Sequence, residues 1–292
     1  MSSRQVHIIG ASGRSGRALS RTLLDAGDTV VPVVRDRDRW AAGGLMVPPR
    51  VADLNDPGRL EAALIDATAV VCCAHARHAA SVITAAPPTA RLVFLGSTRK
   101  FTRWPDDHGN GVLAGEAVFL ASGRSGVMLH PTMIYGARGE NNVQRLAALL
   151  RRLPVLPLPD GGAALVQPIH QDDVTRAVLA ALARDWDGPH SLVLAGPSPV
   201  TYAAFIRAIA AAAGLRPPRI LSVPALPLIA AAALTRFLPG LPTIASAEVR
   251  RLLEDKAFDV APMIDALGFT PAALAEGLAR TFPASIGGAI QA

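Results

Sequence analysis

The stretch Val6-His7-Ile8-Ile9-Gly10-Ala11-Ser12-Gly13-Arg14-Ser15-Gly16 decides the fold. It opens with a short apolar run typical of a strand, and residues 18–27 beyond the glycines follow a helical pattern that ends at Gly27. A strand, a glycine-rich turn and a helix in this order form the context in which such a motif binds a dinucleotide. The stretch therefore predicts a βαβ unit that begins a parallel sheet.

Each glycine of this turn has its own expected role. Gly10 permits the tight turn, Gly13 lets the backbone approach a pyrophosphate, and Gly16 lets the helix pack close to the strand. The helix N-terminus offers unpaired N–H groups and a partial positive charge to a diphosphate. An ordinary turn with three glycines is the alternative. The predicted cofactor contacts in this stretch are Gly10, Ser12, Gly13, Arg14, Ser15 and Gly16.

Composition limits the class of protein. The 292 residues are 50% hydrophobic and carry a net charge of +6, with arginines scattered along the chain. This length suits one large α/β domain, or one domain with a smaller lobe. Nucleic-acid binding would need a basic stripe with a reading motif, and the sequence has neither. We therefore expect no nucleic-acid partner, and arginines that face an anionic cofactor.

The cysteines and the apolar segments indicate in which cellular compartment we expect the protein. Cys72 and Cys73 are adjacent, so in a strand they point to opposite faces and suit a reducing compartment. No metal-ligand spacing surrounds them, and we expect no metal. The first strand begins almost at once, which predicts a cytoplasmic protein without a signal peptide. The longest apolar stretch, 224–234, is too short to span a bilayer. It predicts a buried or groove-lining helix, with peripheral membrane contact as the alternative.

The end of the second strand, residues 29–34, bears on the choice of dinucleotide. An acid at this position binds the ribose hydroxyls of NAD, whereas arginine binds a 2′-phosphate. Arg35 occupies the position, and Arg14, Arg37 and Arg39 are near enough to help. This arrangement favours NADP(H) over NAD(H). The alternative is that Asp36 or Asp38 reaches the ribose.

Five further strands are expected, and polar residues follow several of them. The third strand ends near Ala52, and the others span 69–74, 91–95, 126–130 and 191–195. An irregular stretch over 102–111 and a helix over 112–121 are expected between two of them. Asp53 follows the third strand, where the adenine edge is expected. Ligands of open parallel sheets lie beyond the C-terminal strand ends. The residues there that we predict to lie near the reactive ring of a cofactor, and to be catalytic candidates, are His75, Ser97 and Thr98.

The composition changes at Pro199, after which alanine-rich helices are broken by prolines. The fold class we predict is α/β, with a Rossmann-type doubly wound parallel sheet over residues 1–198. A smaller, mostly helical substrate lobe is expected over residues 199–292, and the two parts are free to interleave. Monomer and homodimer are both open. The helices expected in the lobe are 202–213, 225–237, 246–253 and 271–281.

Several motifs in order resemble the extended and atypical short-chain dehydrogenase/reductase superfamily over nearly the whole chain. The motifs are GASGRSG (10–16), Asp53-Leu54, LGST (95–98), HPTMIYG (130–136), PIHQDDV (168–174) and DKAFD (255–259). The chain is similar to bacterial NAD-dependent epimerase/dehydratase-like proteins and to the NAD(P)-binding accessory subunit of respiratory complex I. Together with the strand ends, the resemblance implies these further cofactor contacts: Arg35, Asp53, Leu54, Cys73, Ala74, His75 and Pro131.

The catalytic pair of that superfamily, Tyr-x-x-x-Lys, is absent from this chain. The tyrosine position falls on His108 and the lysine position on Val112, and Lys100 comes too early. Tyr135 and Tyr202, the two tyrosines of the chain, lie elsewhere. Valine can neither hold the nicotinamide ribose nor lower the pKa of a neighbour.

Three hypotheses follow from this departure. The first is an oxidoreductase acting on a small or apolar carbonyl-type substrate, with His108, His75 or water as the source of the proton. The second is a sensor or structural protein that binds NADP(H) without chemistry. The third is a sugar-nucleotide epimerase/dehydratase, against which the missing pair argues. Polar groups persist at the strand ends, and this favours the first hypothesis.

Overall fold

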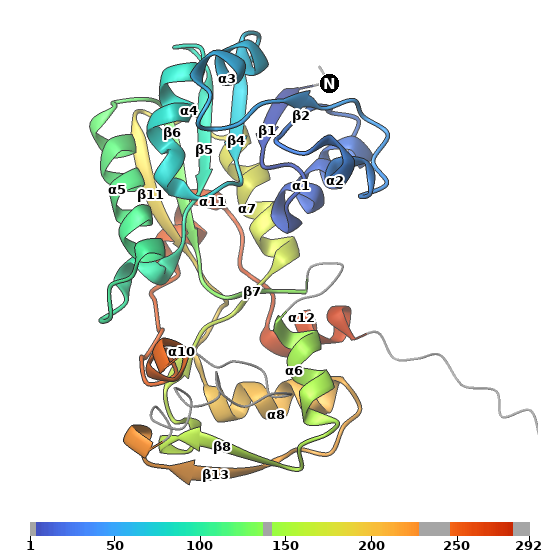
Figure 1. The fold of residues 1–292 in the computed structure, drawn as a ribbon, viewed down its shortest axis with the longest axis vertical. Helices are drawn as coiled ribbons and strands as arrows, with labels where there is room; N and C mark the ends of the chain where they lie inside the picture. The colour runs from blue at the N-terminus through green and yellow to red at the C-terminus, as the bar shows by residue number, and fades with distance from the viewer. Residues whose placement is uncertain (1–3, 137–141, 228–245, 283–292) are drawn as a thin grey trace, which may run out of the picture.

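The computed structural model describes residues 4–136, 142–227 and 246–282, and its centre is a seven-stranded parallel sheet (Figure 1). The strand order is β3-β2-β1-β4-β5-β6-β11, and every pairing is parallel. The predicted doubly wound α/β fold is therefore confirmed. The strands are β1 (Gln5–Ile9), β2 (Thr29–Val34), β3 (Arg50–Val51), β4 (Ala69–Cys72), β5 (Arg91–Leu95), β6 (Gly126–Pro131) and β11 (Pro189–Leu194).

Helices cover both faces of this sheet. One apolar cluster joins Ile8 to the helices α1, α7 and α11, and a second joins Ile9 to α3, α4 and α5. Burial on both faces explains why the strands are nearly continuous apolar runs. The helices are α1 (Arg14–Asp25), α2 (Arg37–Ala41), α3 (Pro57–Leu64), α4 (Ala79–Ala85), α5 (Asp107–Ala121), α7 (Gln171–Ala183) and α11 (Ala261–Leu267).

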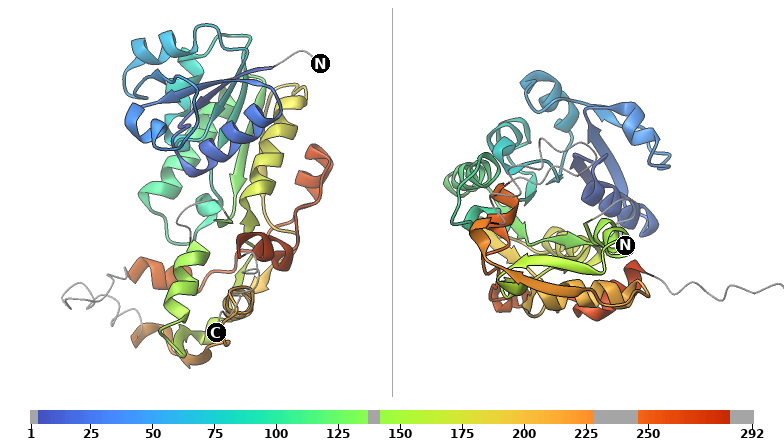
Figure 2. Two further views of the ribbon diagram at one scale, coloured as in Figure 1. Left: turned by 90° about the vertical axis from the view of Figure 1, so that its right-hand side faces the viewer. Right: turned by 60° about the horizontal axis from the view of Figure 1, so that its bottom comes forward.

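A smaller lobe lies beyond the C-terminal ends of the strands (Figures 1 and 2). Its apolar core joins Tyr135 and Val143 to Phe205, Ile209 and Leu278, so segments on both sides of residue 198 build it. The two parts interleave, and α11 returns to lie beside α7. The lobe elements are α6 (Asn142–Leu150), β8 (Val155–Pro159), α8 (Tyr202–Ala212), β13 (Arg219–Val223), α10 (Ser246–Arg251) and α12 (Leu274–Thr281). Short strand pairs are β7 (Ile134–Tyr135) with β10 (Ile169–His170), and β9 (Leu165–Val166) with β12 (Val200–Thr201).

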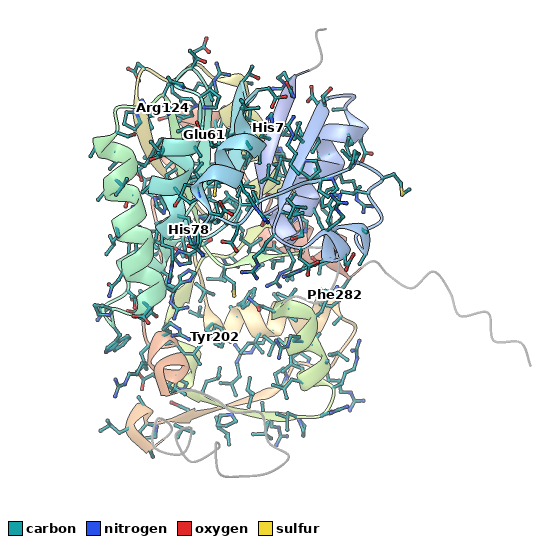
Figure 3. All side chains as sticks on the ribbon, turned by 45° about the horizontal axis from the view of Figure 1, so that its top comes forward. His7, Glu61, His78, Arg124, Tyr202 and Phe282 are labelled. Atoms are coloured by element: carbon teal, nitrogen blue, oxygen red, sulfur yellow. The ribbon has the colours of Figure 1, made fainter. Side chains whose placement is uncertain are left out.

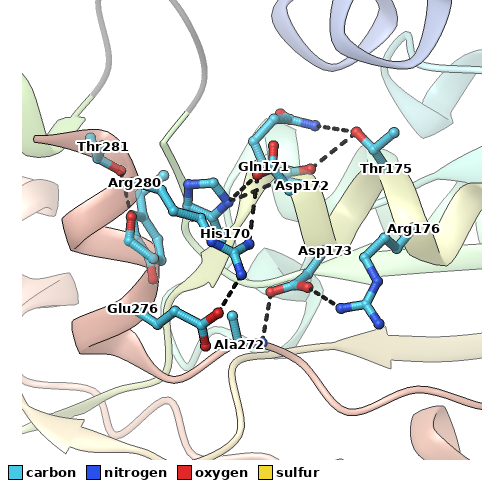
Figure 4. Close-up of polar contacts among 12 residues, drawn as sticks. His170, Gln171, Asp172, Asp173, Thr175, Arg176, Ala272, Glu276, Arg280 and Thr281 are labelled. Carbon is cyan, nitrogen blue, oxygen red and sulfur yellow. Dashed lines mark hydrogen bonds and ion pairs between the residues drawn. The ribbon is translucent and has the colours of Figure 1, made fainter. Parts of the chain in front are cut away.

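The start of α7 fastens the lobe to the sheet (Figure 4). Asp173 is fully buried and accepts hydrogen bonds from the backbone N–H of Ala272 at 2.9 Å and from Arg176 at 3.0 Å. Arg280 of α12 lies 3.7 Å from Asp172. The buried carboxylate of Asp173 thus satisfies a donor almost a hundred residues away in sequence, and this holds the last helix of the lobe against the sheet.

Helix α5 begins earlier than the sequence led us to expect. We expected an irregular stretch as far as Gly111, but the helix starts at Asp107, and Asp106 caps it by accepting the N–H of Gly109 at 2.8 Å. The glycines near the start of α5 let this helix pack closely against neighbouring segments. A Cβ on Gly109 would lie 2.8 Å from the Arg99 carbonyl oxygen, and one on Gly111 would lie 2.9 Å from the His75 ring. His108 therefore sits on the first turn of a fixed helix.

Other differences concern the C-terminal part. Helix α11 was not expected, and α10 and α12 are shorter than predicted. Most of the predicted helix 225–237 falls within 228–245, outside the described residues. None of the helices in the three described segments combines the length and apolar character needed to cross a membrane.

A buried polar network underlies the end of β5. The Glu116 carboxylate accepts hydrogen bonds from Lys100 at 2.5 Å, from Ser191 at 2.5 Å and from His130 Nε2 at 3.2 Å. The other ring nitrogen of His130 accepts the backbone N–H of Ser97 at 3.2 Å. Because these groups are nearly excluded from solvent, the network fixes the backbone where β5 passes into the 3-10 helix η2 (Thr98–Phe101).

The close approach of α5 to the chain after β4 predicts an unequal effect of two Gly-to-Ala changes. A Cβ on Gly115 would lie 1.9 Å from the Ala76 carbonyl oxygen, whereas Gly58 in α3 has only the tip of the Asp56 side chain, 3.9 Å away. We expect Gly115→Ala to lower the free energy of unfolding by about 2 kcal/mol, the typical cost of overpacking. Gly58→Ala should leave it unchanged or slightly higher. Urea denaturation followed by circular dichroism measures both, and equal stabilities would contradict the packing described.

The His130 network predicts a stability that falls in acid. Burial and the charge of Lys100 lower the pKa of His130 from 6.5 to about 4. Burial alone would raise the pKa of Glu116, but the hydrogen bonds from Lys100 and Ser191 outweigh it and leave that pKa lowered. Both groups bind protons more readily in the unfolded chain, so the free energy of unfolding falls as pH falls from 6.5 towards 4.

The variant His130→Gln isolates this contribution. Glutamine can still accept from Ser97 and donate to Glu116, but it does not titrate. The loss of stability between pH 6.5 and pH 4 should therefore be shallower in His130→Gln than in the parent protein. His78→Gln, at a histidine outside this network, is the control and should keep the parent slope. Parallel curves for parent and His130→Gln would refute the assignment.

Candidate functional site

A cavity of about 390 Å³ lies at the C-terminal ends of β1, β2 and β4. Its walls also include Asp36, Arg39, Asn55 and His78. Figure 3 shows His78 on the side of the sheet that faces the lobe. The structure thus brings most of the predicted cofactor contacts to one place. The predicted contacts that line it are Gly10, Ser12, Gly13, Arg35, Asp53, Leu54, Cys73, Ala74 and His75.

The glycine turn has the geometry that a diphosphate needs. Gly10 has a φ of +74°, and a Cβ there would lie 3.2 Å from the Ala74 nitrogen. A Cβ on Gly16 would lie 2.4 Å from the Gly10 carbonyl oxygen. Helix α1 has Gly13 as its N-cap, a residue with no side chain that could cap the helix. The N-terminus of α1, with its partial positive charge, therefore follows directly on the glycine turn, where an anionic ligand would be stabilised.

The remaining predicted contacts do not line this cavity. Arg14, Ser15, Gly16 and Pro131 are outside its lining. Ser15 donates its hydroxyl hydrogen bond to Gln171 at 3.0 Å, which ties α1 to α7. The Pro131 carbonyl accepts the Thr98 hydroxyl at 3.3 Å. Ser15 and Pro131 thus have structural partners, and cofactor contact for the four remains a prediction.

The end of β2 presents arginines to the cavity and uses its acids locally. Asp36 caps α2 by accepting the N–H of Arg39 at 2.9 Å, and Asp53 accepts the N–H of Asn55 at 2.8 Å. Arg35 and Arg39 line the cavity and are exposed. Asp38, which we had considered for the ribose, is not in the lining. The rim therefore carries guanidinium groups beside carboxylates that already accept backbone hydrogen bonds.

A second cavity, of about 530 Å³, lies between the sheet and the lobe. Three of the predicted catalytic candidates, Ser97, Thr98 and His108, line it together. Ser97 accepts the N–H of Arg99 at 3.1 Å, so its hydroxyl proton remains free to donate. Thr98 donates its own proton to Pro131. The lobe contributes Tyr202, which Figure 3 shows beneath the sheet.

His75 and His108 form a pair of rings in contact. His75 Nε2 lies 3.1 Å from His108 Nδ1, and the rings meet edge to face with centroids 4.4 Å apart. His75 Nδ1 accepts the backbone N–H of Arg77 at 3.1 Å. A neutral His75 must therefore carry its proton on Nε2 and donate it to His108. This leaves the proton of His108 on Nε2, with no partner among the residues that the structure describes.

The environment keeps both rings uncharged near neutral pH. Burial, the second histidine and the Arg77 guanidinium lower the pKa of His75 to about 4. Burial, together with the charge of Arg99, also lowers the pKa of His108. His108 is consequently placed to act as a neutral hydrogen-bond donor at the wall of the second cavity.

The cysteines and Tyr135 are weaker candidates for proton transfer than the histidines. Burial raises the pKa of Cys72 to about 12 and raises that of Cys73 further, so both remain thiols. Tyr135 is buried, and burial raises the pKa of its phenol. In the segments 4–136, 142–227 and 246–282, no group of His, Cys, Asp and Glu side chains is arranged to hold a metal ion.

Sequence reasoning missed several residues of the second cavity. Glu254 is 5% exposed and accepts hydrogen bonds from the Thr102 hydroxyl at 2.8 Å and the Arg103 N–H at 2.5 Å. Arg251 and Lys256 lie beside it in the lining. Only the DKAFD motif pointed to this segment, because its partners are some 150 residues away. The lining is richer in charge than the composition of the lobe suggested.

Comparison with known proteins agrees with this geometry. Residues 10–111 match a family described as NAD(P)H-binding. Uncharacterized proteins of Mycobacterium bovis and Mycobacterium tuberculosis are 31% identical over 300 residues, which is 98% of this chain and 30% of theirs. The chain therefore spans less than a third of the length of these relatives.

Solved structures share the fold over almost the whole chain. An NADPH-dependent quinone oxidoreductase from Escherichia coli, complexed with NADPH, is 20% identical, with a TM-score of 0.71 over 95% of this chain and 99% of its own. UDP-N-acetylglucosamine 4-epimerase from Bacillus cereus is 14% identical, with a TM-score of 0.70 over 96% of both chains. MoeE5 with UDP-glucuronic acid and NAD is 22% identical, with a TM-score of 0.69 over 94% of this chain and 97% of its own.

These neighbours include both NAD and NADPH complexes, so they do not show which of the two cofactors this chain prefers. The first cavity lies at the glycine turn where the matched family begins. The resemblance found in the sequence is thus confirmed at the level of the fold: residues 10–111 match an NAD(P)H-binding family, and almost the whole chain shares its fold with an NADPH-dependent quinone oxidoreductase and a UDP-N-acetylglucosamine 4-epimerase.

Proposed function

We propose that this protein is an NADPH-dependent reductase of a carbonyl-type substrate in which His108, oriented by His75, replaces the missing tyrosine. The observation that carries the proposal is the histidine pair: His75 lines the first cavity, and its partner His108 lines the second cavity together with Ser97 and Thr98. The Escherichia coli neighbour, described as an NADPH-dependent quinone oxidoreductase, supports a quinone as one member of that substrate class. Cytoplasmic location, and a monomer or homodimer, remain predictions from the sequence.

The residues of the chain have one chemical task in this reaction. The chemistry that a bound reduced nicotinamide would supply is hydride transfer to the carbonyl carbon, which would move the electron pair of the C=O bond to oxygen. His108 Nε2–H and the Ser97 hydroxyl donate hydrogen bonds to that oxygen as its negative charge grows. A proton from solvent then completes the product. A quinone would instead take the hydride at one oxygen or at a conjugated ring carbon, so that the negative charge on the other carbonyl oxygen is delocalised over the ring. Such a substrate needs the least help from hydrogen-bond donors.

The preference for NADPH rests on the end of β2. Arg35 and Arg39 line the rim of the first cavity, where a 2′-phosphate would lie. Asp36, the acid that could have bound the ribose hydroxyls, is engaged in capping α2. A planar guanidinium binds a phosphate with paired hydrogen bonds, and this supports NADP(H) over NAD(H).

A non-catalytic NADP(H) sensor or structural protein is the second candidate. Val112 favours it, because this residue is 1% exposed at the lysine position and offers the ribose no polar group. The same residue weighs against a sugar-nucleotide epimerase, although such enzymes share the fold. Both leading candidates bind NADPH, and only the reductase oxidises it.

The cofactor proposal predicts unequal effects of two neighbouring arginines. Arg35→Ala should weaken NADPH binding at least tenfold, roughly the value of one charge-assisted hydrogen bond, and leave NADH binding nearly unchanged. Arg37→Ala is the matched control, because Arg37 is exposed and absent from the cavity lining. Fluorescence titration of the apo protein measures all four affinities. Tighter binding of NADH than NADPH by the parent protein would contradict the assignment of Arg35.

The catalytic proposal predicts that His108 matters and Tyr202 does not. With NADPH and a panel of quinones and aldehydes, His108→Leu should lower kcat/KM roughly 10²-fold, as expected for the loss of a positioned donor. Tyr202→Phe removes the other ring donor of the cavity and should retain nearly full activity. NADPH oxidation followed by absorbance provides the rates. Unchanged activity in His108→Leu would exclude the assigned role, and a parent protein inactive with the whole panel would favour the sensor.

The pH profile distinguishes a neutral donor from an imidazolium acid. An imidazolium would lose its proton as pH rises through its pKa, so the rate would fall across the neutral range. The pKa values of His75 and His108 are lowered, and both rings are neutral there. We therefore expect kcat/KM of the parent protein to stay flat between about pH 7 and pH 8.

A further inference from the structure

The second cavity contains more cationic donors than its own acceptors satisfy. Lys256 Nζ donates one hydrogen bond, to the Arg251 carbonyl oxygen at 2.6 Å. The guanidinium of Arg251 lies 3.9 Å from Asp106, too far for a hydrogen bond. Within the described part of the chain, neither side chain has a closer carboxylate. Both residues line the cavity that holds Ser97 and His108.

The carboxylates around this cavity are already committed elsewhere. Glu254 accepts the Thr102 hydroxyl and the Arg103 N–H. Asp255 accepts the N–H of Leu165 at 2.8 Å. Asp106 accepts Arg99 Nε at 2.7 Å and the N–H of Gly109. Their oxygens thus serve backbone, hydroxyl and Arg99 donors, and the charges of Lys256 and Arg251 remain poorly matched.

Burial increases the value of a matching anion. The Arg251 side chain is 25% exposed, and burial lowers the pKa of Lys256. A cation that has lost water without gaining a full partner is costly, and a ligand that supplies acceptor oxygens offsets that cost. The cavity is therefore more favourable to a negatively charged ligand than to a neutral one of the same size.

We infer that the substrate carries an anionic group, a carboxylate or a phosphate, which Lys256 and Arg251 bind while its carbonyl reaches Ser97 and His108. The part of this inference that concerns the carbonyl group rests on the proposed reductase function. The part that concerns the anionic group rests only on the residues that line the cavity. It departs from the small or apolar carbonyl-type substrate of the first hypothesis drawn from the sequence. An anionic aldehyde, oxo acid or quinone fits both ends.

Binding measurements test the proposed recognition of an anionic group without requiring that the protein turn over a substrate. With NADPH present, isothermal titration compares benzoate, phenyl phosphate and the neutral probe benzyl alcohol. We expect the parent protein to bind benzoate or phenyl phosphate at least about tenfold more tightly than benzyl alcohol, and the stronger of the two anions identifies the group. Equal affinity for the anionic and neutral probes would overturn the inference, even if NADPH oxidation were observed.

Matched variants locate the site. Arg251→Gln and Lys256→Met should each weaken binding of the preferred anion about tenfold and leave the affinity for benzyl alcohol unchanged. Arg250→Gln removes the same charge from the exposed neighbour in α10, which is outside the cavity lining, and should bind as the parent does. Equal losses in Arg250→Gln and Arg251→Gln would mean a non-specific charge effect and overturn the site.

Steady-state kinetics then test whether one substrate carries both the anionic group and the reacting carbonyl. If the protein reduces aldehydes, Arg251→Gln should raise KM for 4-carboxybenzaldehyde about tenfold with little change in kcat, and leave KM for its methyl ester unchanged. A KM that rises equally for acid and ester would contradict anion recognition. Anion binding without turnover in the parent protein would support this site and count against the reductase.

Discussion

The close packing of α5 on the chain that follows β4 is the contact on which the rest of the site depends. Gly111 leaves no Cβ against the His75 ring, and Gly115 leaves none against the Ala76 carbonyl, so the two segments approach to atomic contact. That approach brings His108 against His75 and places Glu116 beside Lys100 and His130. A larger residue at either glycine would push the helix away and separate both groups at once.

Buried charge in this protein is arranged in two different ways. Around Glu116 every donor is matched, and the network holds the backbone of Ser97 in place. Around Lys256 and Arg251 the nearby carboxylates are satisfied by other donors. A matched network rigidifies a structure, whereas poorly matched cations favour an anionic ligand. The first arrangement therefore suits a scaffold and the second a binding site, and Ser97, which the first holds in place, lines the same cavity as Lys256 and Arg251.

The sheet and the glycine turn could be predicted because their signals are local. Strands buried on both faces are continuous apolar runs, and the turn requires glycines at fixed spacing. The start of α5 was missed because Gly109 and Gly111 disfavour a helix, and the contacts that compensate come from Arg99 and His75. Strand β8 was missed because it contains two prolines, which a strand paired on one side tolerates. Glu254 could not be placed, since Thr102 lies far away in sequence.

The replacement of tyrosine and lysine by His108 and Val112 narrows the chemistry that the site supports. A neutral imidazole stabilises charge on oxygen by donating a hydrogen bond, but it is a weaker acid than a tyrosine beside a lysine. Val112 belongs to the apolar core with Phe119, so nothing at that position restores the missing cation. Reductions whose product anion is already stable, as in a quinone, demand least from such a site. Cations at Lys256 and Arg251 add a way to hold the substrate that does not depend on the oxygen that reacts.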